Sequence, residues 1–163
     1  MYSVCAIGGE LDAGSQQQLL YAQCGVVCQF ASAREISGQK SLREFIPMVQ
    51  NAIRFGQLKT YFNAYQECVG YVIWAFLTPD VEKQFIAGKV RPLNDWEFND
   101  GTSAWILDMA VSSGSLPYVL EDLRDVVFRN QAHVTYFRVK RGRQLCKRMS
   151  RSSVSHFLSS RTK

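Results

Sequence analysis

The chain has 163 residues, of which 47% are apolar and 20% are charged, and its formal net charge is +5 at pH 7. This composition is typical of a globular protein and argues against a fibrous or disordered chain, and the length suffices to bury a core. We expect one domain over residues 1–150, with a basic C-terminal segment over residues 141–163.

The N-terminus lacks the features of an export signal. Its short apolar run ends at Gly8 and Gly9, no basic residue precedes that run, and Glu10 and Asp12 follow it. A signal peptide needs a basic start and a longer apolar core. No apolar run in the chain is long enough to span a bilayer. We therefore expect a cytoplasmic protein without a transmembrane segment.

Two helices are predicted before the first apolar strand. Apolar residues recur at helical spacing over residues 15–33, and the polar stretch 37–40 interrupts the pattern. Ser41 and Glu44 have the spacing of a capping box, which predicts that a second helix begins at Ser41 and ends near Gly56. The apolar face of this second helix would consist of Leu42, Phe45, Ile46, Val49, Ala52 and Ile53.

The chain has five cysteines and two histidines, His133 and His156, and no Cys-x-x-Cys pair. Neither histidine lies near a cysteine pair at zinc-finger spacing, so we expect no structural metal. Cys24 and Cys28 lie one helical turn apart, where two thiols can hold a metal or act as a redox couple. Burial preferences favour a second interpretation, in which both are small apolar residues on a buried helix face.

A hairpin and a short helix follow in the sequence. Residues 58–63 and 68–77 are predicted strands joined by the polar turn 64–67. The second strand is almost entirely apolar and is expected in the interior of the sheet. Thr78 and Pro79 have the residue types of a helix N-terminus, which predicts a short helix after this strand.

A single carboxylate interrupts the apolar strand that is predicted at residues 103–111, after a polar, loop-like stretch at residues 92–101. Burial of this carboxylate, Asp108, is costly unless the group is paired or hydrogen-bonded. Strand alternation offers a second interpretation, in which Asp108 faces solvent and Leu107 and Met109 face inward. Asp108 is therefore either a functional-site residue or a structural or exposed one.

The last predicted elements are an amphipathic helix at residues 116–130 and a strand at residues 134–139 that closes the sheet. Helices packed on a mostly antiparallel sheet define an α+β domain. The inward-facing residues of the helix would be Val119, Leu120, Leu123, Val126 and Val127. The tryptophans are expected in the core rather than at a cofactor, and they are Trp74, Trp96 and Trp105.

Charge is distributed unevenly along the chain. Asp125 is the last acidic residue, and every charged residue after it is basic. A basic end attracts an anionic partner, which is a nucleic acid, a membrane surface or an acidic protein. A solvated segment that only aids solubility fits the pattern equally well. Few aromatic residues accompany the basic ones to stack on bases, so we expect no nucleic-acid partner.

Four motifs, in this order, resemble those of the toxin-activating lysine acyltransferases, the RTX toxin acyltransferase family. That family has a P-x-A-Y-x-x-W-A strand, a D-W-x-S-G-D turn, a W-F-I-D-W-I strand and an I-R-V strand. The counterparts here are residues 69–75, 95–101, 105–110 and 137–139. The resemblance extends over about residues 20–150.

The resemblance implies a fold like that of the GCN5-related acetyltransferases, with transfer of a fatty acyl group from acyl carrier protein to lysines of a toxin. A histidine near the N-terminus and the strand aspartate carry the chemistry of the family, and the aspartate corresponds to Asp108. The arginine of the late strand corresponds to Arg138, which the resemblance implies as a substrate-binding residue. A structural ion pair with Asp122 or Asp125 is the alternative for Arg138.

The family histidine has no counterpart in this chain. Ser37 occupies its position, and no histidine occurs before His133. Imidazole is suited to removing a proton from lysine near neutral pH, which an unaided serine cannot do. Ser37 remains a catalytic candidate because its hydroxyl can orient a substrate or hydrogen-bond to a tetrahedral intermediate. Asp108 is then the candidate base.

Two functional interpretations follow from the resemblance. The first is an acyltransferase that modifies and so activates a co-produced toxin or bacteriocin, with no bound cofactor. Its acyl donor would be acyl carrier protein or a siderophore-derived group. Relatives in microcin gene clusters help to attach such a group to a C-terminal serine, and this hydroxyl acceptor fits the loss of the histidine. The second interpretation is a non-catalytic scaffold or partner subunit. Both interpretations are compatible with a homodimer or with a second maturation protein.

Overall fold

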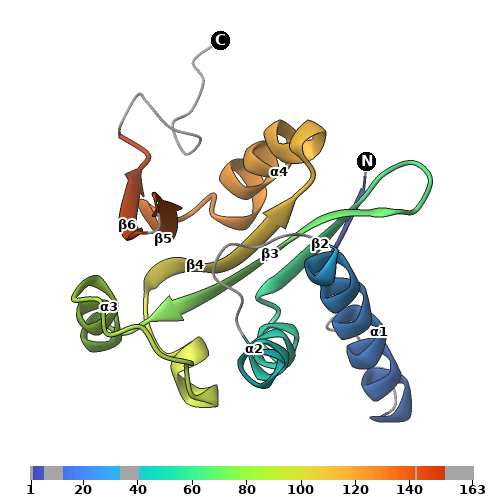
Figure 1. The fold of residues 1–163 in the computed structure, drawn as a ribbon, viewed down its shortest axis with the longest axis horizontal. Coiled ribbons are helices and arrows are strands. Elements are labelled where there is room, and N and C mark those ends of the chain that lie inside the picture. Colours follow the sequence, from blue (N-terminus) through green and yellow to red (C-terminus); the bar gives the residue numbers. More distant parts are fainter. Residues whose placement is uncertain (1, 6–12, 34–40, 142, 153–163) are drawn as a thin grey trace.

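The computed structural model describes residues 2–5, 13–33, 41–141 and 143–152. In this part of the chain a six-stranded sheet lies between helices on its two faces (Figure 1). The strands are β1 Tyr2–Cys5, β2 Leu58–Phe62, β3 Cys68–Leu77, β4 Ser103–Val111, β5 His133–Lys140 and β6 Arg143–Ser150. The α-helices are α1 Ala13–Ser32, α2 Leu42–Arg54, α3 Pro79–Ile86 and α4 Leu116–Asp122, and the short helical turns are η1 Asp95–Phe98, η2 Ser113–Ser115 and η3 Leu123–Val127.

The strands follow one another across the sheet in chain order, from β1 at one edge to β6 at the other. Neighbouring strands are antiparallel except for β4 and β5, which run parallel because α4 and η3 cross between them. β3 is buried along most of its length, as its apolar sequence predicts for an interior strand. The structure confirms the predicted α+β fold of the GCN5-related acetyltransferase type.

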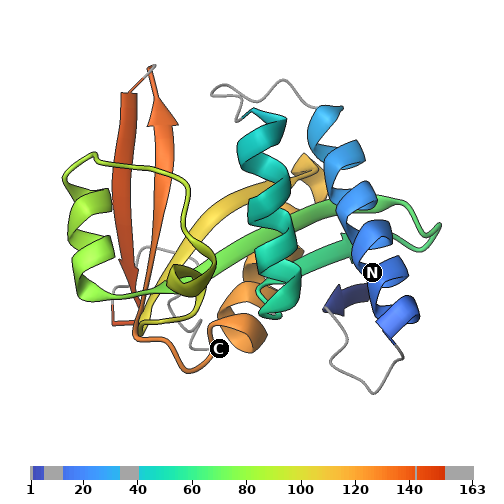
Figure 2. The ribbon, with the colours of Figure 1, turned by 90° about the horizontal axis from the view of Figure 1, so that it is seen from below.

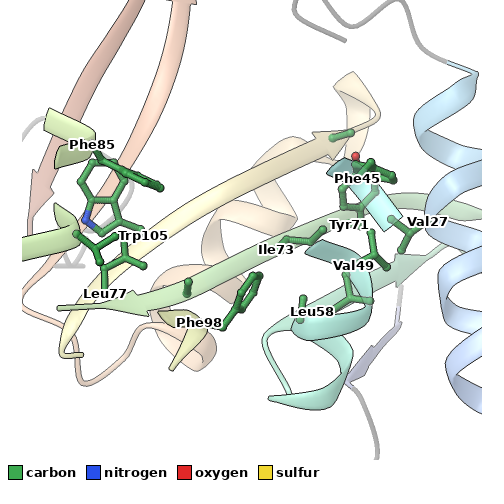
Figure 3. Close-up of a cluster of buried hydrophobic side chains, with 14 residues drawn as sticks. Val27, Phe45, Val49, Leu58, Tyr71, Ile73, Leu77, Phe85, Phe98 and Trp105 are labelled. Atoms are coloured by element: carbon green, nitrogen blue, oxygen red, sulfur yellow. The ribbon is translucent and has the colours of Figure 1, made fainter. Parts of the chain in front are cut away.

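The helices form a layer on each side of the sheet. α1, α2 and α3 cover one face, and α4 with η3 covers the other (Figures 1 and 2). Because strand side chains alternate between faces, the core has two halves. The half under α1, α2 and α3 includes Tyr71, Ile73 and Trp105 (Figure 3). The half under α4 includes Trp74 and Ile106.

The capping box predicted for the second helix is present at the start of α2. The backbone N–H of Ser41 donates to Glu44 Oε2 at 3.2 Å, which satisfies a donor at the helix end. Phe45, Val49 and other residues of the predicted apolar face are buried. Leu42 is not: its side chain is 70% exposed, and residues 41–44 at the start of α2 are all exposed.

The sheet extends further at both edges than the sequence predicted. The strand predicted to close it corresponds to β5, and β5 pairs along its full length with β6. β6 lies in the basic segment, and an exposed strand rich in arginine and lysine lacks the apolar alternation by which buried strands are recognised. β1, at the opposite edge, was also missed. Residues 95–98, predicted as a loop, form the helical turn η1.

The helix predicted at residues 116–130 is shorter and changes geometry within its length. α4 ends at Asp122, and the chain continues as the π-helical turn η3. A π-turn is wider than an α-turn and therefore shifts the period at which side chains face the core. Leu123 is buried as predicted, whereas Val126, also predicted to face inward, is 57% exposed.

Candidate active site

Asp108 lies in β4 next to a β-bulge. Ile73 of β3 is opposite Asp108, but the next residue of β3, Trp74, is opposite Ile106, so Leu107 is the extra residue. Cross-strand partners share a face of the sheet. Asp108 therefore lies on the face of Ile73, which is covered by α1 and α2, and Leu107 packs into the same half of the core.

The bulge decides between the two interpretations of the orientation of Asp108. Simple alternation with Leu107 and Met109 inside is wrong, because Met109 is 38% exposed while Asp108 is half-buried. The backbone N–H of Met109 donates to Asp108 Oδ1 at 2.9 Å. This bond fixes the carboxylate against its own strand, and strand bulges commonly re-aim a side chain in this way.

Beside Asp108, β4 and β5 separate from each other. The two strands are paired only from Ala104 to Ile106 and from Val134 to Tyr136. Beyond these pairs both strands continue, and Figure 2 shows them diverging. Asp108 and Arg138 are each the second residue after the last pair, so both lie where the strands part. We call this region the β4–β5 divergence.

Arg138 and Asp108 lie at the same divergence but on different faces of the sheet. Phe137 packs beside Phe85 of α3, with ring centroids 6.1 Å apart, so alternation directs Arg138 to the opposite face. Arg138 is exposed, and the alternative prediction, a structural ion pair between Arg138 and Asp122 or Asp125, is wrong. Asp122 and Asp125 have other partners, and within the described ranges Arg138 forms no ion pair.

Ser37, which the sequence predicts at the position of the family histidine, lies outside the residues that the structure describes, and so does His156. His133, the one histidine that the described ranges contain, begins β5 at the paired end of β4 and β5. The β4–β5 divergence is at the opposite end of these strands. The described part of the chain therefore places Asp108 and Arg138 at the same end of the β4–β5 pair, on opposite faces of the sheet, and His133 at the other end.

A polar network holds η1 against the end of α2. Asp95 accepts from Asn51 Nδ2 at 2.9 Å and from Arg54 at 3.3 Å. Trp96, the next residue, was predicted in the core and is 70% exposed, because η1 turns it outward. Trp74 and Trp105 are buried as predicted.

Glu97 completes η1 with a bidentate contact to Arg91. The two N···O distances are 2.7 and 2.5 Å, and Glu97 also accepts from the backbone N–H of Asn94. The hydrogen bonds from Arg91 are the largest cause that lowers the pKa of Glu97 to about 2. This contact ties Arg91 to η1 and so stabilises the loop between α3 and β4.

Cys24 and Cys28 pack against the core from α1, in agreement with their interpretation as buried apolar residues. Burial, with a smaller contribution from Cys28, raises the pKa of Cys24 to about 11, so its thiol is not a nucleophile at neutral pH. In the described ranges, no group of three histidine, cysteine or carboxylate side chains is placed to hold a metal ion.

The sequence reasoning missed a buried charged cluster on the α4 face. Lys59 Nζ lies 2.9 and 2.8 Å from the two carboxylate oxygens of Asp122, and the Tyr61 hydroxyl donates to the same carboxylate at 2.8 Å. The lysine side chain is only 4% exposed. A lysine inside the apolar strand β2 was the available signal. The cluster joins β2 to the C-terminal end of α4.

The fold, with β4 and β5 separating beyond Ile106 and Tyr136, is of the GCN5-related acetyltransferase type. Residues 20–153 match the RTX toxin acyltransferase family, and the chain belongs to that family of acyltransferases. No curated protein matches the chain. No described helix has the length and apolar character needed to cross a membrane.

Proposed function

We propose that this protein transfers an acyl group to a toxin or toxic peptide that is made alongside it, with Asp108 as the catalytic residue. The observation that supports this most directly is the bulge at Leu107. It directs a half-buried carboxylate from an otherwise apolar strand to the point where β4 and β5 separate. Because the chain belongs to an acyltransferase family, we interpret this carboxylate as a residue that takes part in acyl transfer.

In the proposed reaction the acceptor attacks the carbonyl carbon of an acyl thioester. The new bond joins that carbon to the acceptor nitrogen or oxygen, and the carbon–sulfur bond breaks. Asp108 takes the proton that the acceptor loses and returns it to the departing thiolate. The Met109 N–H that holds Asp108 Oδ1 keeps the carboxylate in one orientation, as a positioned base requires. Ser37 would orient the substrate.

Arg138 is proposed to bind the donor or the substrate. It is exposed at the β4–β5 divergence, and within the described ranges no carboxylate pairs with it. A guanidinium in this position recognises a phosphate or a carboxylate through parallel hydrogen bonds. The phosphate through which acyl carrier protein holds its acyl thioester is such an anion, and so is a carboxylate elsewhere on a siderophore-derived group. We expect no bound cofactor, so the acyl group would come directly from this donor.

The missing imidazole favours a hydroxyl acceptor over a lysine. An ammonium group must lose a proton before it can attack, whereas a hydroxyl is already neutral at the pH of the cell. His133 lies at the far end of the β4–β5 pair and is not placed to deprotonate a lysine beside Asp108. The acceptor we favour is therefore a peptide hydroxyl, as in microcin maturation, with toxin lysine acylation as the second possibility.

The test is the intact mass of each toxin or peptide encoded beside this gene, produced with and without the protein. A gene-dependent increase supports the proposal. The increment identifies the transferred group, and hydroxylamine sensitivity distinguishes an ester from an amide. If no neighbouring product changes mass, the proposal is wrong for those substrates. If the protein acts only as a scaffold, the same mass increase should still be observed when Asp108 is replaced by asparagine.

A further inference from the structure

A cavity of about 230 Å³ lies at the paired end of β4 and β5, away from Asp108. Its lining comes from α3, the starts of β4 and β5, and β6. Ser103, which lines it, precedes Asp108 by five residues on β4, or roughly 16 Å along a strand. The cavity is therefore separate from the candidate active site, and the proposed acyl transfer does not use it.

One wall of the cavity presents hydrogen-bond acceptors and a negative charge. Glu82 reaches across from α3, where its Oε1 accepts from Trp105 Nε1 and its Oε2 accepts from Ser103 Oγ, both at 3.0 Å. Because Ser103 donates its hydroxyl proton to Glu82, its oxygen offers only lone pairs to the cavity. These two bonds also fix the carboxylate in place.

The opposite wall presents donors and a positive charge. Arg148 of β6 lies opposite Thr135 in the β5–β6 ladder, and His133 precedes Thr135 by two residues and so shares its face. Arg148 and His133 are both exposed, and the guanidinium is a permanent cation. Within the described ranges, Arg148 and Glu82 form no ion pair with each other or with any other group. The cavity thus keeps two opposite charges apart.

We propose that this cavity binds a small group that carries a cationic end and an anionic end. The cationic end, an ammonium group, would face Glu82 and Ser103, and the carboxylate end would face Arg148 and His133. A simple anion is disfavoured by the fixed Glu82 carboxylate, and a simple cation is disfavoured by Arg148, so the charge pattern selects against both. The volume suits an amino acid or a pair of charged side chains of a peptide.

The indole N–H of Trp105 gives a local readout, because it donates to Glu82 at the wall of the cavity. Its NMR resonance is followed while glycine, 4-aminobutyrate or 6-aminohexanoate is added, so that the separation of the charges varies. Butyrate and butylamine serve as probes with a single charge. An acetylated and amidated Lys-Glu dipeptide tests whether the natural source is a peptide rather than a free amino acid.

We expect at least one doubly charged probe to shift the Trp105 resonance, and Arg148→Gln to weaken its binding by about tenfold or more. Lys147→Gln is the matched control, because Lys147 is the neighbouring exposed residue of β6 and points to the other face. An equal response to butyrate or butylamine alone would overturn the proposal. So would the absence of any shift with every probe, or equal binding by the Arg148→Gln variant.

Discussion

Asp108 owes its position to one extra residue in β4. Without the bulge at Leu107, alternation from Ile106 would turn Asp108 to the face covered by α4. With the bulge, the carboxylate lies on the face of α1 and α2, beside the opening of β4 from β5. A change of one residue in the length of this strand therefore decides which surface of the sheet carries the candidate base.

The cluster of Lys59, Asp122 and Tyr61 leads to a prediction of stability. Replacement of Lys59 by methionine leaves the carboxylate of Asp122 buried without its cation, which should lower the free energy of unfolding by about 3–5 kcal/mol. Urea denaturation measures this loss. Adding Asp122→Asn should restore part of it, because the unpaired charge is then removed while Tyr61 keeps a partner.

The control for this prediction is Arg54→Met, which breaks the pair with Asp95. Both side chains of that pair are more than half exposed, at 60% and 64%, so the cost should stay below about 1 kcal/mol. Equal losses for Lys59→Met and Arg54→Met would show that the buried cluster contributes no more than a surface ion pair.

At the scale of elements, η1 leads to a prediction of pH dependence. The pKa of Glu97 is about 2 in the folded protein, below its reference value of 4.5. A lowered folded-state pKa stabilises the protein above the unfolded-state pKa, and this contribution is lost as the pH falls from about 4.5 towards about 2. The Tm of the wild type should therefore exceed that of Glu97→Gln near neutral pH, and the difference should shrink across this acidic window.

Thermal unfolding followed by circular dichroism between about pH 6 and about pH 3 measures this difference. Glu121→Gln is the control, because its contact with Arg124 is long, at 3.6 Å, and its side chain is 69% exposed. A difference in Tm between wild type and Glu97→Gln that stays constant with pH would contradict the role assigned to the Arg91–Glu97 pair.

Elements with local signals could be predicted from the sequence, and elements defined by distant partners could not. The capping box of α2 and the apolar strand β4 can each be recognised from a few consecutive residues. β6 is an edge strand whose polar sequence gives no burial pattern, and only its pairing with β5 reveals it. The π-turn at η3 likewise follows from packing, which is why Val126 was wrongly placed in the core.

In the candidate site, too, features with a local signal could be predicted from the sequence and features set by distant partners could not. Asp108 was recognisable as a lone carboxylate in an apolar strand, and the resemblance added Arg138. The bulge and the separation of β4 from β5 depend on the register between strands, which a single sequence does not display. The same holds for the opposite faces on which Asp108 and Arg138 lie, and for the pairing of Lys59 with Asp122.

At the scale of the whole molecule, charge is segregated along the sheet. All acidic residues precede residue 126, so the β5–β6 hairpin at one edge carries only basic charged side chains. If the acyl donor is an acidic carrier protein, its association should weaken steeply as ionic strength rises, because salt screens attraction between surface charges. Lys147→Glu should slow association, whereas Arg43→Glu should change it little, because Arg43 is an exposed residue of α2, which packs on β2 and β3.

Surface plasmon resonance with acyl carrier protein at increasing salt concentration measures this dependence. The expected result is a falling association rate constant with a nearly unchanged dissociation rate constant. Binding that does not depend on salt, or equal effects of the two substitutions, would contradict an electrostatic role for the hairpin.

The central claim, that Asp108 carries acyl transfer, is tested most directly by the intact mass of the co-produced toxin or peptide after incubation with the wild type or with Asp108→Asn. Asp80→Asn is the matched control, because Asp80 is an exposed carboxylate on α3. The account predicts that the wild type and Asp80→Asn add the same mass, while Asp108→Asn remains folded and adds none. Full modification by a folded Asp108→Asn variant would contradict it.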